Sequence, residues 1–269
     1  MKSYPNILQS FEIAGIFLVG FQLIIPICFI LNKFIGFEVS RLISYILAVG
    51  IPLGVVCIIL KKKTGAISFN FSIENRRIIP YVIVGTIFLY CGIASPISAL
   101  IPMPESNKEA FMNSGGLPGI YRLFQYVIAA PILEELIFSG IILNGLLKKY
   151  SPQKSILITS FLFGFIHLDP WQFITVFIMG IFTGWIYFKT RSLSLSIIIH
   201  ATYNLASILM RYYIIHNLLT DNVLLEMYGG IINLIFAVVG SLIIISICIY
   251  FLMKEFNKKE TEMAKLIKF

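Results

Sequence analysis

Two adjacent carboxylates, Glu134 and Glu135, lie in one apolar stretch of about 25 residues. If this stretch is a helix that spans a membrane, an ionised side chain near its middle is costly. Such a side chain is normally kept only beside a polar cavity or a partner. Three further polar residues of the apolar segments are candidates for that partner, namely His167, His200 and Asn204.

The spacing of these residues predicts that they meet. His200 and Asn204 are four residues apart, so on a helix they lie on one face, one turn from each other. Counting from the predicted helix ends at about 1.5 Å per residue places Glu134, His167 and Asn204 roughly 17–20 Å deep, and His200 one turn shallower. We therefore expect the carboxylates, both histidines and the asparagine to share one layer of the membrane.

The chemistry open to such a set is limited. A buried carboxylate can take a proton from water, with an imidazole sharing the task, so that the water attacks an amide. A second histidine and an amide side chain can donate hydrogen bonds to the developing oxyanion. The set Glu134, His167 and His200 could also hold Zn²⁺ with a water in the open position. Residue types alone do not separate a metal-free peptidase from a zinc peptidase.

The composition sets the class of protein that must position these residues. The chain has 269 residues, of which 58% are hydrophobic and 13% charged, and a mean hydropathy of +0.90. A water-soluble globule needs more polar surface, so the sequence predicts an integral membrane protein. Because the apolar runs are continuous rather than alternating, we expect an all-α polytopic bundle, forming a single domain over residues 1–269.

About eight transmembrane helices are predicted. The fifth is short for a complete crossing, and Asp169-Pro170 ends it. The first is interpreted as a retained helix rather than a cleaved signal peptide. The connection Pro102–Gly119 is expected to hold a short helix at most. The predicted spans are Phe11–Leu31, Val39–Leu60, Ile78–Ile101, Ile120–Leu147, Ser155–Leu168, Trp171–Phe188, Leu193–Met210 and Gly229–Met253.

The basic residues predict the orientation. The formal net charge is +8. Of the 21 lysines and arginines, 16 lie in the two terminal segments and in the connections that the predicted spans place on the same side of the membrane. By the positive-inside rule, both termini are cytoplasmic, in what we expect to be the cell membrane. The charges are spread over the connections instead of forming one face, which argues against a nucleic-acid partner.

Two features of the apolar runs concern packing. All four cysteines lie inside these runs and are interpreted as small buried hydrophobic residues rather than disulfide or metal partners. Gly180 and Gly184 form a small-xxx-small pair, which we expect to pack helices together within the bundle. The sequence does not determine an oligomeric state.

The polar residues also carry a family resemblance. Glu134-Glu135, Phe163-x-x-x-His167 and His200-x-x-x-Asn204 resemble, in order, the three motifs of the CPBP family of intramembrane proteases, also called Abi, which contains CAAX prenyl proteases and bacteriocin-processing proteins. The resemblance covers about residues 117–209. It implies that Glu134 and His167 activate water, that His200 and Asn204 form the oxyanion hole, and that Glu135 is a supporting carboxylate.

One position departs from the family pattern. The first motif of the family is E-E-x-x-x-R, but the residue four positions after Glu135 is Ser139. Without the arginine, Glu135 lacks an i,i+4 ion pair. The glutamate is then protonated, paired with another helix, or part of a weakened site.

These observations predict an intramembrane endopeptidase. Its substrate would be a membrane-associated peptide or C-terminal tail, lipidated or not, reached from the cytoplasmic side, as in CAAX processing or in bacteriocin processing and self-immunity. Besides substrate, its partners are membrane lipids. The alternative is a catalytically weakened family member that acts as a membrane scaffold, regulator or immunity protein. A proton-coupled transporter would need broken helices in corresponding halves, which the sequence does not show.

Overall fold

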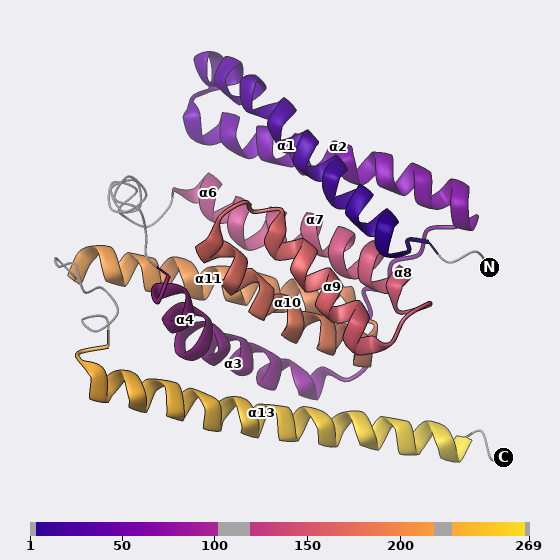
Figure 1. Cartoon of the computed structure of the whole chain (residues 1–269), viewed down its shortest axis with the longest axis vertical. Helices are drawn as coiled ribbons and strands as arrows, with labels where there is room; N and C mark the ends of the chain where they lie inside the picture. The colour runs from indigo at the N-terminus through magenta and orange to yellow at the C-terminus, as the bar shows by residue number, and fades with distance from the viewer. Residues whose placement is uncertain (1–3, 102–118, 218–227, 267–269) are drawn as a thin grey trace.

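The computed structural model describes residues 4–101, 119–217 and 228–266, and within them it contains helices and no strand. The predicted connection from Pro102 therefore lies outside the described residues except at its end, Gly119. The described chain confirms the all-α bundle. Figure 1 shows its long helices running side by side, with both chain ends at the same end of the molecule.

Each predicted span corresponds to a helical segment. Several segments combine α-helix with π-helical stretches. The label η marks these stretches and also one 3₁₀ turn, η1. The elements are α1 (Ile7–Ile35), α2 (Phe37–Thr64), η1 (Arg76–Ile78, a 3₁₀ turn), α3 (Ile79–Leu89), η2 (Tyr90–Ala94), α4 (Ser95–Ala99), α6 (Ile120–Phe124), η3 (Gln125–Ala129), α7 (Ala130–Glu135), η4 (Leu136–Leu143), α8 (Asn144–Leu146), α9 (Pro152–Phe165), α10 (Pro170–Thr190), α11 (Leu193–Asn217) and α13 (Ile231–Leu266).

Six helices of the described chain are long and apolar enough to cross a membrane. Helix α1 is a seventh if its two halves are counted as one span. It bends by 43° between Gln22 and Pro26, because the proline lacks the N–H for an intrahelical bond. The remaining segment, α9, has 14 residues, which corresponds to about 21 Å. The prediction that the fifth segment is short is therefore confirmed.

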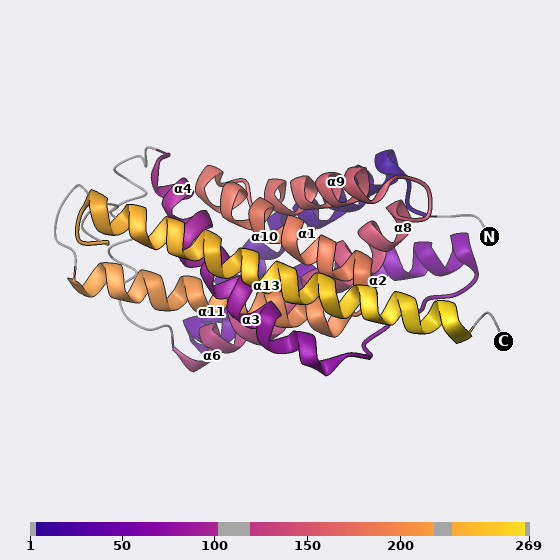
Figure 2. The same cartoon turned by 90° about the horizontal axis from the view of Figure 1, so that it is seen from below.

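The helices form three groups (Figures 1 and 2). The hairpin of α1 and α2 lies along one side, and the two helices approach closely at Gly20, where a Cβ atom would lie 2.5 Å from the Pro52 ring. The long helix α13 lies along the opposite side against α3. Between these groups, the helix from α6 to α8 packs with α9, α10 and α11.

Close packing between α9 and α10 depends on glycine. A Cβ atom on Gly180 would lie 3.0 Å from Ser160, and one on Gly184 would lie 3.0 Å from Ile156. Both glycines therefore allow the α9 backbone to approach α10, as small residues do in membrane helix pairs. This confirms the prediction that the small-xxx-small pair packs inside the bundle.

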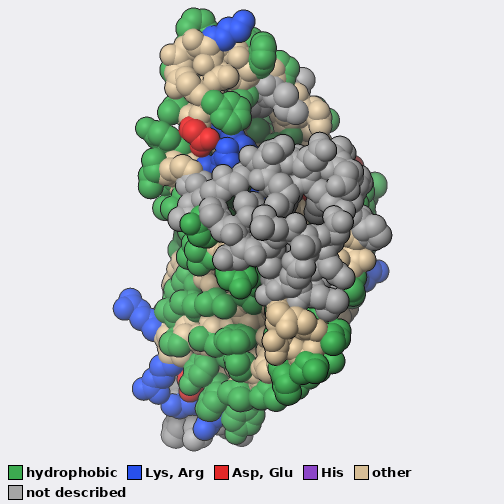
Figure 3. Space-filling view, turned by 90° about the vertical axis from the view of Figure 1, so that its left-hand side faces the viewer, with side chains coloured by type: hydrophobic (Ala, Val, Ile, Leu, Met, Phe, Trp, Pro, Cys, Tyr) green, Lys and Arg blue, Asp and Glu red, His purple; other side chains and the backbone are tan. Residues whose placement is uncertain are grey.

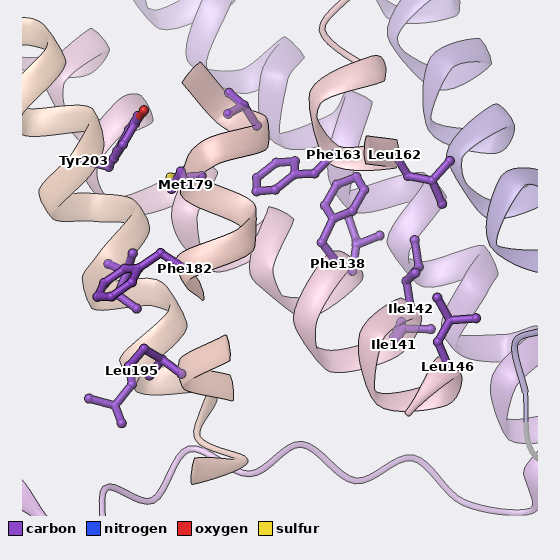
Figure 4. Packing of buried hydrophobic residues seen from close by; sticks show 14 of the residues in the cluster. Phe138, Ile141, Ile142, Leu146, Leu162, Phe163, Met179, Phe182, Leu195 and Tyr203 are labelled. Carbon is purple, nitrogen blue, oxygen red and sulfur yellow. The ribbon is translucent and has the colours of Figure 1, made fainter. Parts of the chain in front are cut away.

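The core lies where η4 meets α9. The rings of Phe138 and Phe163 stack with centroids 4.3 Å apart, and Ile141, Ile142 and Leu146 are buried on the same helix as Phe138 (Figure 4). The end view in Figure 3 shows that hydrophobic side chains make up most of the coloured surface, with an acidic side chain beside basic ones where the α1–α2 hairpin lies. The four cysteines are free thiols; Cys248 is buried, as predicted, whereas Cys28, Cys57 and Cys91 are only partly buried.

Candidate active site

The two carboxylates lie on α7, a short α-helical stretch between two π-helical ones. The π-helix η3 ends just before α7, where the N–H of Ala130 bonds to the carbonyl of Gln125, five residues back. The π-helix η4 begins directly after Glu135. π-helical turns inside α-helices occur frequently at functional sites, because they change the direction in which side chains point.

Glu134 and Glu135 point into the protein. Their exposed fractions are 8% and 0%, and that of His200 on α11 is 4%. His200 lies between the two carboxylates: its Nδ1 is 3.1 Å from Oε1 of Glu135, and its Nε2 is 3.8 Å from Oε2 of Glu134. The structure therefore brings together three of the predicted site residues, from helices that are distant in sequence.

Glu135 is fully engaged by hydrogen bonds. Its Oε1 accepts from Nδ1 of His200, and its Oε2 accepts from the hydroxyl of Ser139 at 2.5 Å. Ser139 is the residue that stands in place of the motif arginine. Of the three states expected for Glu135, the structure therefore shows the pairing with another helix, supplemented by a neutral donor at i+4.

Glu134 keeps one oxygen available. Its Oε1 accepts a 2.5 Å hydrogen bond from the hydroxyl of Tyr45, on α2. Its Oε2 faces Nε2 of His200 at 3.8 Å, which is too long for a direct hydrogen bond and suits a bridging water. The two neighbouring carboxylates thus have different surroundings, which is the usual way to give two acids different roles.

His167 lies beside this cluster without joining it directly. Its Nδ1 contacts the backbone carbonyl of Phe163 at 2.8 Å, and the Phe163 ring lies 5.8 Å from the His167 ring and 5.4 Å from the His200 ring. Because a carbonyl can only accept, Nδ1 carries the proton and Nε2 is left for a water or substrate. Both histidines and Glu134 are described, and no hydrogen bond or ion pair joins His167 to Glu134.

Asn204 holds the backbone of the helix that carries the carboxylates. Its Nδ2 donates to the carbonyl of Tyr126 at 2.8 Å. In the π-helical register of η3, this carbonyl would accept from residue 131, but Pro131 has no N–H. Asn204 therefore donates to a carbonyl that the proline leaves without a partner. The second N–H of its side-chain amide can donate to another acceptor.

Two residues of the cluster were missed by sequence reasoning. Tyr45 stands in a predicted span without any motif, and its only signal is a phenol in the apolar run of α2. Ser139 was noted as the loss of an arginine rather than as a donor. In both cases the hydroxyl could be assigned only once the helices were placed side by side.

The predicted metal ligands, Glu134, His167 and His200, all lie in the described part of the chain. Within residues 4–101, 119–217 and 228–266, no group of three or more His, Cys, Asp or Glu side chains is arranged to hold a metal ion. Glu134, His167 and His200 are therefore not placed as the ligands of one ion in this structure.

The fold and the cluster together define a polytopic helical membrane protein with a buried acid and imidazole site. Residues 116–206 match the family model described as type II CAAX prenyl endopeptidase Rce1-like. This part of the chain is similar to an Rce1-like domain, which is consistent with the CPBP family. No curated protein and no solved structure matches the chain.

The family match and the apolar helices agree on the class. Both indicate an integral membrane protein. At the level of the family, the match supports a CAAX-type intramembrane protease. The matched residues include all the predicted site residues and begin and end close to the limits of the resemblance found in the sequence.

Proposed function

We propose that this protein is an intramembrane endopeptidase in which Glu134 activates the water that attacks a peptide bond. The observation that supports this most directly is the difference between the two carboxylates. Glu135 has both oxygens engaged by His200 and Ser139, whereas Glu134 presents Oε2 towards an imidazole nitrogen 3.8 Å away. Glu135 is therefore suited to orient His200, and Glu134 to act on water.

The proposed reaction begins with a water between Oε2 of Glu134 and Nε2 of His200. Glu134 takes a proton from this water as its oxygen forms a bond to the carbonyl carbon of the substrate. The carbonyl oxygen becomes an oxyanion, which the second N–H of Asn204 stabilises. His200 adds an Nε2–H in its imidazolium form, because its Nδ1–H is already donated to Glu135. When the carbon–nitrogen bond breaks, Glu134 returns the proton to the leaving amine, so that one water is consumed for each bond cut.

His167 has a supporting place in this proposal. Its Nε2 is the ring atom left available, and the Phe163 ring lies against both imidazoles. A water or substrate group that occupies the space beside Glu134 would therefore have His167 as a second acceptor. This agrees with the role that the family resemblance implies.

The proposed substrate is a membrane-associated peptide or C-terminal tail. A site at the centre of a helical bundle selects chains that can enter the membrane layer, and the CAAX-type family match suggests a tail, lipidated or not. We further propose that both termini are cytoplasmic, because the basic residues favour that side. Processing of a bacteriocin-like peptide, or immunity to one, is a narrower version of the same proposal.

The test replaces Glu134→Gln in the purified protein, reconstituted in lipid and assayed on matched lipidated and unmodified peptides. The amide keeps the size of the side chain but cannot take a proton, so kcat should fall by about 10²–10⁴. Glu12→Gln, an exposed change near the start of α1, is the control and should retain full activity. Turnover by Glu134→Gln at the normal rate would refute the assigned role.

The same assay addresses the scaffold alternative. The hydrogen bond from Ser139 to Glu135 favours an intact site, because it supplies a donor where the motif arginine is missing. A scaffold would cleave neither peptide, and its biological function would survive both Glu134→Gln and His167→Ala. An enzyme would lose that function with either change. Activity of the chelator-treated protein, with metal analysis, would decide the metal requirement separately.

A further inference from the structure

Three polar contacts join α2 to the helix from α6 to α8, and they follow the same order along both helices. Glu38 pairs with Arg122 at 3.1 Å, and Arg41 donates to the hydroxyl of Tyr126 at 3.0 Å. The third contact is the 2.5 Å hydrogen bond from Tyr45 to Glu134. We call these three pairs the polar seam.

The polar seam lies on one face of each helix. Glu38, Arg41 and Tyr45 are three and four residues apart, so they form a single stripe on α2. Their partners lie in the same order along the opposing helix, which runs beside α2 in Figure 1. The seam therefore sets how far α2 is shifted along the helix that carries the carboxylates, and it brings one phenol to Glu134.

The Tyr45 hydroxyl restricts what Glu134 can do. A hydrogen bond to an ionised oxygen is short and roughly twice as strong as one between neutral groups. With Oε1 held by Tyr45, the carboxylate plane is fixed and Oε2 is the oxygen that faces His200. A carboxylate without this bond could rotate about its last side-chain torsion, which has broad energy wells.

We propose that Tyr45 is a positioning residue for Glu134, and that the α1–α2 hairpin is thereby part of the active site although it lies outside the matched residues 116–206. The inference rests on the proposed function. Tyr45 acts through Glu134: it holds the carboxylate so that Oε2 meets the water. Arg41 and Glu38 hold α2 in the register that makes this contact possible.

The first test replaces Tyr45→Phe, which removes one hydroxyl and keeps the ring. We expect kcat to fall by about 10- to 100-fold while KM changes less than about twofold, because the bond orients the base rather than the substrate. Tyr81→Phe is the matched control: Tyr81 stacks on Phe251, away from the site, and this variant should behave as the wild type. Rates are compared per folded protein, as judged by thermal unfolding.

The second test does not depend on turnover. The infrared difference between wild type and Glu134→Gln isolates the carboxylate bands of Glu134, and the same difference is recorded in the Tyr45→Phe background. We expect those bands to shift in Tyr45→Phe and to stay unchanged in Tyr81→Phe. Unshifted bands in Tyr45→Phe would overturn the inference. So would a kcat of Tyr45→Phe within twofold of that of the wild type, when Glu134→Gln is inactive. Failure of the proposed function is a different result, because Glu134→Gln would then still cleave the substrate.

Discussion

At the scale of single residues, the cluster shows how a membrane interior keeps two adjacent acids. Glu135 has no exposed surface, yet each of its oxygens accepts a hydrogen bond. A buried carboxylate without such partners would pay a large desolvation penalty. Ser139 offers one hydroxyl where the family motif has a guanidinium, so it satisfies one oxygen without adding a charge.

Replacement of Ser139→Ala tests this contact. The change leaves Oε2 of Glu135 buried with one donor fewer, which should lower the free energy of unfolding by about 1–3 kcal/mol. Activity should fall as well, because Glu135 orients His200. Thermal unfolding and peptide cleavage measure the two effects. Ser246→Ala, an exposed serine of α13 that bonds to the carbonyl of Leu242, is the control, and an equal loss there would contradict the assignment.

The sequence predicted which residues meet better than it predicted their partners. Counting along helices placed Glu134, His167, His200 and Asn204 in one layer. His200 does lie against both carboxylates, whereas Nδ1 of His167 contacts the carbonyl of Phe163 instead. The role of Asn204 is different in detail: it bonds to a backbone carbonyl that becomes free only through a proline and a change of helical register. Such a register change has no marker in hydrophobic periodicity, which assumes 3.6 residues per turn.

At the scale of elements, the site depends on how closely α9 approaches α10. Gly180 and Gly184 allow this approach, and α9 carries Phe163, with His167 in the turn directly after its end. The order and type of these helices could be predicted from apolar runs and from breakers such as Asp169-Pro170. The helix ends could not, because propensity changes gradually there: α13 continues to Leu266, well past the predicted end at Met253.

Gly180→Leu tests the helix contact. The new side chain would begin 3.0 Å from Ser160, so the helices must separate, at a cost of about 1–3 kcal/mol. Thermal unfolding should show this loss, and cleavage should fall because His167 moves with α9. The matched control is Gly240→Leu on α13, where nothing lies within 4 Å of an added Cβ atom. Equal stability of the two variants would show that the α9–α10 contact is not tight.

At the scale of the whole molecule, the described chain is an apolar bundle with both chain ends at one end (Figure 1). Composition was sufficient to predict this class, because continuous apolar runs match the thickness of a membrane. The order in which the helices pack side by side could not be predicted, because lipid-facing and buried apolar faces look alike in sequence. The placement of α2 against Glu134 is one example.

The orientation can be tested with reporters fused to the chain ends. A reporter active only in the cytoplasm should be active at both the N-terminus and the C-terminus, because the basic residues lie mostly on that side. A reporter active only outside the cytoplasm should be silent at both. Opposite signals at the two ends would contradict the prediction of an even number of crossings, and reversed signals at both would contradict the proposed orientation.

The π-helical stretches on either side of α7 have a mechanical consequence. A turn closed by a bond to the fifth residue back holds one more residue than an α-helical turn, so each stretch stores chain length inside the span. Moving that surplus residue past Glu134 would swivel both carboxylates about the helix axis while the ends of the span stay in place. The direction in which both acids point is thus tied to the register of the turns that flank them.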